Sequence, residues 1–191
     1  MWIQSLVHVA KIRIQSAAKR KPTMEGFQGV GLGIGAIGVA AIGIKACGIA
    51  DSFLSIPYQD DNREPIQRTY DFCKNLGRTL ILPGLTEELF WRVVLTPSGG
   101  FQSVTSVLLL NTVFSLYHLI PRGIEKMGLI EKAPEAFSDP AFLGLAFVLG
   151  NACSYAYHAS NYSLYAPVLV HAVAVAFWLD VCGGEKLIRN V

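Results

Sequence analysis

The chain is short of charge. Lysine, arginine, aspartate and glutamate make up 16% of its 191 residues, whereas soluble domains are usually about one quarter charged. Hydrophobic residues supply 52% of the sequence, and the mean hydropathy is +0.40. The net charge is only +2, and no basic stripe is interleaved with aromatic residues, which argues against a nucleic-acid partner. The composition predicts a single domain embedded in the lipid bilayer.

Cysteine pairs that would indicate a metal site or a disulfide framework are also missing. The four cysteines are far apart and form no CxxC motif: Cys47, Cys73, Cys153 and Cys182. We interpret them as small packing residues in apolar helices.

Acidic residues are absent from the first 24 positions, which form a basic arm (residues 1–24). Its cations are Lys11, Arg13, Lys19, Arg20 and Lys21, and its apolar residues fall on one helical stripe. Such an arm can be an organelle transit peptide or a helix lying on an anionic membrane surface. An ordinary solvated basic face is the third interpretation, and the sequence leaves all three open.

Residues 28–50 form a glycine-rich apolar run that is long enough to span a bilayer. Its GIGAIG stretch fits GxGxxG, but no short strand precedes it and glycines continue on both sides, so we reject a dinucleotide site. The pairs Gly29/Gly33 and Gly31/Gly35 are instead typical of close helix packing in lipid.

The remaining sequence predicts an all-α, polytopic membrane helix bundle. A core of residues 66–182 contains helices at 66–82, from Thr86 to about 97, and at 101–120, 140–158 and 164–182, followed by a short tail, 183–191. Pro121 is expected to end the third of these helices, and 122–139 to be a charged loop. Basic residues in the 51–75 and 122–139 segments place these on the cytoplasmic, matrix or stromal side. If 28–50 crosses once, the basic arm lies on the opposite side.

The stretch TEELFWRVV places three charged residues in an apolar run. Charged groups at membrane depth cost roughly 2.5–3.5 kcal/mol each on insertion scales, so they tend to be paired and functional. Glu88 and Arg92 have the i,i+4 spacing of an intrahelical ion pair, while Glu87 points about 100° away. A carboxylate removed from water is a stronger base, which suits Glu87 to general-base chemistry. The alternative is a helix start at Thr86, with both acids in its first turn.

Two histidines lie in separate apolar segments. His118 follows the run FQSVTSVLLLNTVFSLY, and His171 lies within APVLVHAVAVAFW with nothing polar beside it. A single buried histidine is usually structural, but two of them together with a paired-carboxylate motif favour a common site.

These motifs resemble those of the CPBP family, which contains the CAAX proteases, the bacteriocin-processing enzymes and the abortive-infection proteins. EELFWR is similar to the family's EExxxR motif, FSLYH to its FxxxH motif, and APVLVHA to the segment with the third-motif histidine. The resemblance implies an intramembrane four-helix core that hydrolyses peptide bonds. In that scheme Glu87 and His118 would activate a water, Glu88 and Arg92 would orient and neutralise the site, and His171 would stabilise the oxyanion. A peptide or prenylated peptide would be the substrate.

The resemblance also bears on whether the site holds a metal ion. The family has been described as metal-dependent, and Glu87, His118 and His171 could hold Zn²⁺ with an open position. Because HExxH is absent, we expect no cofactor.

The third motif departs from the family pattern. Where the family has HxxxN or HxxxD, this chain has Val175, which offers no hydrogen bond, and loss of one oxyanion donor typically costs about 10²–10³ in rate. Asn111 or Asn151 could take its place. The alternative function is therefore an inactive homologue that serves as a structural or assembly subunit of a larger membrane complex. Either way the sequence predicts an integral protein of the plasma membrane or of a mitochondrial or plastid inner membrane.

Overall fold

The computed structural model describes residues 2–48, 64–96, 103–182, 184 and 188. The described residues form helices and contain no strand, which confirms the predicted all-α class. Most of the predicted tail (183–191) and most of the polar segment 51–65 lie outside them. The elements are α1 (Trp2–Lys19), α2 (Met24–Ala46), α3 (Pro65–Thr79), η1 (Leu80–Leu85), α4 (Thr86–Glu88), η2 (Leu89–Val94), α5 (Val104–Leu116), η3 (Tyr117–Leu119), α6 (Ile120–Lys126), η4 (Glu135–Ser138), α7 (Pro140–Ala159) and α8 (Tyr165–Asp180).

Three described helical segments are long and apolar enough to cross a membrane: Met24–Ala46, Val104–Lys126 and Pro140–Ala159. The apolar helix α8 has 16 described residues, about 24 Å at the usual helical rise. By length and composition these segments support the predicted integral membrane protein.

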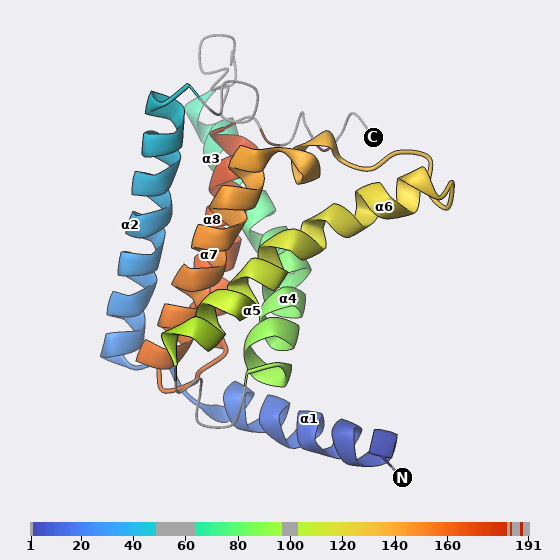
Figure 1. Cartoon of the computed structure of the whole chain (residues 1–191). Coiled ribbons are helices and arrows are strands. Elements are labelled where there is room, and N and C mark those ends of the chain that lie inside the picture. The colour runs from blue at the N-terminus through green and yellow to red at the C-terminus, as the bar shows by residue number, and fades with distance from the viewer. Residues whose placement is uncertain (1, 49–63, 97–102, 183, 185–187, 189–191) are drawn as a thin grey trace.

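Helices α2, α7 and α8 lie side by side, with α3 next to α8 and α5 crossing α7 (Figure 1). Their shared core is built from small residues, which let the helix backbones approach closely: Val30, Ala152, Cys153, Ala156, Ala166 and Val170. This packing brings the middle of α8 close to the segment that carries the two glutamates, because η1 and α4 both contact α8.

Only one of the two predicted glycine pairs in α2 packs against a neighbour. A Cβ atom added at Gly29 would lie 3.0 Å from the Cβ of Ala159, and one at Gly33 would lie 3.3 Å from the Cβ of Ala152. At Gly31 and Gly35 it would meet nothing within 4 Å. The Gly29/Gly33 prediction is therefore confirmed and the Gly31/Gly35 prediction is wrong, because the second pair faces away from α7.

We expect Gly29→Leu to lower the thermal denaturation midpoint of the detergent-purified protein, because the new side chain must push α2 off α7. Overpacking of this kind costs typically about 1–3 kcal/mol. Gly31→Leu is the matched control: its side chain enters open space, and loss of a helical glycine is neutral or stabilising. Equal midpoints for the two variants would contradict the observed α2–α7 packing.

Helix α1 lies across one end of the bundle, roughly perpendicular to its long helices (Figure 1). One guanidinium nitrogen of Arg13 donates to the carbonyls of Val94 and Thr96, at 2.9 and 3.0 Å, and Ala17 is buried in a cluster with Val93 and Leu164. Tyr165 at the start of α8 donates to the carbonyl of Ala18. This docking suits a helix that lies on a membrane surface, and its contact with lipid stays a prediction.

Because α2 crosses the bundle, the basic arm and the 122–139 segment lie at opposite ends, so charge alone does not orient the protein.

Two predicted helix boundaries are wrong. Pro121 does not end a helix, because α5 continues through η3 into α6, where Pro121 occupies the first turn and its missing N–H costs nothing. Residues 122–126 of the predicted loop are therefore helical, and so is η4. The chain after α3 breaks at Leu82, the residue with non-helical angles (φ −132°, ψ 116°). Thr86 lies inside the helix that follows and its hydroxyl donates to the carbonyl of Pro83, so the capping interpretation of the two glutamates fails.

Candidate active site

A buried ion pair forms the base of the site. The Arg92 Nε atom lies 3.0 Å from Glu88 Oε2, and both side chains are 1% exposed or less. The i,i+4 pairing predicted from the sequence is confirmed. On its other oxygen, Glu88 contacts His171 Nδ1 at 2.7 Å. The sequence could not place this contact, because α8 lies 83 residues further along the chain.

Arg92 is held on all sides. Its terminal nitrogens donate to the Asn111 side-chain oxygen and to the Gly150 carbonyl, each at 3.0 Å, and its guanidinium lies over the Phe114 ring at 5.2 Å. Asn111 in turn donates to Asn151 and Ser154. Because each of its three nitrogens contacts an oxygen, the guanidinium fixes the Glu88 carboxylate, and through it the orientation of the imidazole of His171.

Glu87 points in a different direction from Glu88. Its Oε2 lies 3.8 Å from His171 Nε2, and its side chain is 20% exposed. That oxygen makes no hydrogen bond within the described residues. The two neighbouring glutamates therefore have different surroundings: the two oxygens of Glu88 lie 3.0 and 2.7 Å from nitrogens of Arg92 and His171, whereas Glu87 Oε2 reaches His171 only at 3.8 Å.

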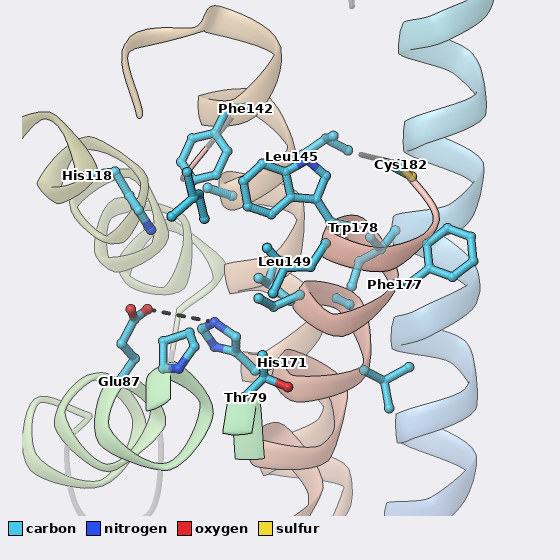
Figure 2. A pocket seen from close by; sticks show the side chains of 18 of the residues that line it. Thr79, Glu87, His118, Phe142, Leu145, Leu149, His171, Phe177, Trp178 and Cys182 are labelled. Carbon is cyan, nitrogen blue, oxygen red and sulfur yellow. Dashed lines mark ion pairs between the residues drawn. The ribbon is translucent and has the colours of Figure 1, made fainter. Parts of the chain in front are cut away.

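Glu87 and His171 open onto a cavity of about 910 Å³. Figure 2 shows the two side chains at one end of it, with Phe142, Leu145, Leu149 and Trp178 lining the space beyond them. The cavity wall is mainly apolar, and its polar described members are Asn75, Arg78, Thr79, Thr86, Glu87, Tyr117, His118 and His171. A cavity of this size and character suits an apolar ligand with a few oriented polar groups.

His118 reaches the same cavity from η3. Its Nδ1 lies 3.2 Å from the carbonyls of Phe114 and Ser115, so Nδ1 carries the hydrogen and donates. The other nitrogen, Nε2, remains for the cavity, and Figure 2 shows the ring directed toward the space in front of Glu87 and His171. No direct ion pair or hydrogen bond joins Glu87 to His118 in the described structure. All five predicted site residues are thus placed: Glu87, Glu88, Arg92 and His171 contact one another, while His118 faces them across the cavity.

Comparison with known proteins identifies a protein family for this chain. Residues 71–177 match the family model described as type II CAAX prenyl endopeptidase Rce1-like. The chain belongs to this family. The match spans every site residue from Glu87 to His171 and confirms the CPBP resemblance. No curated protein and no solved structure matches the chain.

The departure from the family's third motif is visible in the cavity. Val175 lines the wall one turn after His171 on α8, so an asparagine or aspartate at this position of a family member would face the same space. The two predicted substitutes do not: neither Asn111 nor Asn151 lines the cavity, and both side chains are engaged behind Arg92. The proposal that they replace the missing donor is not supported.

Tyr117 is a cavity residue that the sequence reasoning missed. It lines the wall beside His118, and its hydroxyl interacts with the Glu87 carboxylate. It stands directly before the histidine in FSLYH, a position that the family motif leaves unspecified. The place of Tyr117 could be found only from the packing of η3 against the glutamate-bearing segment.

The described residues contain one group of three side chains close enough to share a metal ion: Glu88, Cys153 and His171, with their ligand atoms within 4.8 Å of one another. Both carboxylate oxygens of Glu88 already face a nitrogen, and the Arg92 guanidinium at 3.0 Å would repel a cation. This group therefore does not fit a divalent ion. The predicted alternative set of Glu87, His118 and His171 does not form such a group in the described structure.

Proposed function

We propose that the chain is an intramembrane endopeptidase that cleaves prenylated C-terminal peptides, with Glu87 as the base that activates water. The observation that carries this proposal is the unequal environment of the two glutamates at the end of one cavity. Glu88 is held by Arg92 and His171 at 3.0 and 2.7 Å, while the Oε2 of Glu87 reaches His171 only at 3.8 Å. Family membership supplies the reaction class.

The proposed reaction contains two proton transfers. A water held between Glu87 and Nε2 of His118 gives its proton to Glu87 as its oxygen attacks the scissile carbonyl carbon. His171, oriented by Glu88, donates from Nε2 to the oxyanion when its ring is protonated. The tetrahedral intermediate collapses as the carbon–nitrogen bond breaks. As that bond breaks, Glu87 gives its proton to the departing nitrogen, so the products are an amine and a carboxylic acid and the Glu87 carboxylate is restored.

The cavity supports the substrate class. CAAX substrates carry a prenyl chain on a cysteine close to the C-terminus. A largely apolar cavity of about 910 Å³ can take such a chain while its polar end holds the peptide bond. Entry from the bilayer would suit a substrate that is itself membrane-anchored.

The test is release of the C-terminal peptide from a farnesylated CAAX peptide by the purified full-length protein in liposomes, followed by mass spectrometry. The proposal expects cleavage that depends on the prenyl group, so the same peptide without it is the control. Absence of cleavage of every prenylated peptide in a varied set, by a protein that is folded and inserted, would refute the enzymatic function.

Val175 favours a second candidate, a non-catalytic subunit that keeps the fold. We expect Val175→Asn to raise turnover by about 10–10²-fold, because an amide one turn beyond His171 supplies the donor whose loss typically costs about 10²–10³. Val173→Asn is the matched control, since it adds the same amide to another position on the cavity wall. Turnover that rises only in Val175→Asn would show that the valine at this position lowers the catalytic rate of the wild-type protein. No gain in either variant would rule out Val175 as the missing donor.

A further inference from the structure

We infer that Arg78 binds the free C-terminal carboxylate of the peptide substrate. The inference rests on the proposed function, whose site it extends to a second polar contact. Arg78 belongs to α3, not to any of the three motif segments, and nothing in the EExxxR, FxxxH or histidine motifs refers to it.

Arg78 is the one arginine or lysine among the described residues that line the cavity. No described carboxylate lies within 4.0 Å of it, and among the described residues it makes no hydrogen bond. Arg92, by contrast, has a partner for every part of its guanidinium. Arg78 is an exposed residue, so its guanidinium is accessible to an anionic ligand.

The position of Arg78 suits a ligand that also reaches Glu87. The next residue, Thr79, donates through its hydroxyl to the carbonyl of Ala172 at 3.1 Å, so the backbone beside Arg78 packs against α8 directly after His171. A CAAX peptide has three residues beyond its prenylated cysteine, which span at most about 10 Å when extended. The terminal carboxylate therefore lies within about 10 Å of the bond beside the cysteine, whose place is at Glu87.

Charge determines which way the peptide lies. Glu87 repels a carboxylate, whereas the planar guanidinium of Arg78 can bind one through two parallel hydrogen bonds. The prenyl chain then has the apolar wall around Leu145, Leu149 and Trp178. The cavity would thus bind two groups of the substrate, a hydrocarbon chain and a free carboxylate, which lie on either side of the peptide bond to be cut.

The experiment compares two farnesylated peptides that differ only at the C-terminus, one a free carboxylate and the other a carboxamide. Binding to the full-length protein in a zwitterionic detergent is measured by fluorescence, and cleavage is measured in parallel. We expect the wild-type protein to prefer the carboxylate by about 10–10²-fold, the range for loss of one charged hydrogen-bonding partner. Arg78→Gln should lose this preference, and Arg78→Lys should retain part of it.

Lys74→Gln is the control for loss of a positive charge from α3, because Lys74 is on the same helix but does not line the cavity. It should keep the full carboxylate preference. If Arg78→Gln weakens both peptides equally, Arg78 has a structural role and the inference is overturned. The inference is also overturned if Arg78→Gln still prefers the carboxylate peptide to the carboxamide, or if the wild-type protein shows no such preference.

A lipid phosphate is the competing anion for Arg78. An effect of Arg78→Gln that appears only in vesicles containing anionic lipid, and not in zwitterionic detergent, would assign the residue to a headgroup and overturn the inference. Binding separates the two proposals: carboxylate preference without cleavage refutes the enzymatic function alone, and cleavage without the preference refutes the role of Arg78 alone.

Discussion

Glu87→Gln is expected to reduce the turnover of a prenylated peptide by about 10²–10⁴-fold, the usual contribution of a general base. Glutamine keeps the size of the side chain and its ability to bind water, but it cannot accept the proton. The fold should be unaffected, because the affected Glu87 oxygen makes no hydrogen bond to the described protein. Turnover is measured as peptide release at saturating substrate, with the denaturation midpoint recorded for the same preparation.

Glu125→Gln provides the matched control. Glu125 is a surface carboxylate on α6 that pairs with Arg122 and does not line the cavity. It should leave turnover unchanged. Equal turnover in the Glu87 variant and the wild type would remove Glu87 from the mechanism, whatever the result for the control.

Arg92→Met is expected to destabilise the protein by about 3–5 kcal/mol, the range for breaking a buried ion pair by removing one partner. Methionine leaves the Glu88 carboxylate buried without its cation and deprives Asn111 and the Gly150 carbonyl of their donor. The loss is measured as the change in free energy of unfolding in detergent. Arg122→Met tests the exposed pair with Glu125, in which the side chains are 33% and 23% exposed, and should destabilise the protein far less, because solvent screens an exposed ion pair.

A double variant separates buried charge from lost packing. In Glu88→Gln with Arg92→Met, no uncompensated charge remains, so we expect it to be more stable than Arg92→Met alone. Stabilities that are simply additive, with the double variant worse than either single one, would contradict the direct Glu88–Arg92 coupling.

The part of the site that could be predicted from sequence is the part that is local in the chain. The spacing of Glu88 and Arg92 on one helix determines their contact, and the different orientation of Glu87 follows from helical geometry. The distant contact between Glu88 and His171 depends on how α8 packs against η1 and α4, which no spacing shows. The family resemblance brought His171 into the site, but it assigned the histidine to the oxyanion and did not predict its bond to Glu88.

The fold was predictable at the level of element type and less so at element ends. In the sequence Pro121 suggests the end of a helix, yet the first turn of a helix tolerates proline. Gly29/Gly33 and Gly31/Gly35 have identical spacing, and only the rotation of α2 about its axis decides which pair packs. Arg78 and Tyr117 carry no motif of their own. Their importance comes from the cavity they line, which forms from five or more separate segments.

The central claim is that water reaches Glu87 in a cavity enclosed by membrane helices. The most direct measurement replaces the native cysteines and places a single cysteine at position 87 in liposome-embedded protein, where its rate of reaction with a small charged thiol reagent is followed. A cysteine at Val113, 54% exposed on α5, reports the lipid-facing surface. The account predicts rapid modification at position 87 and little at 113. Position 87 reacting as slowly as position 113 would contradict it.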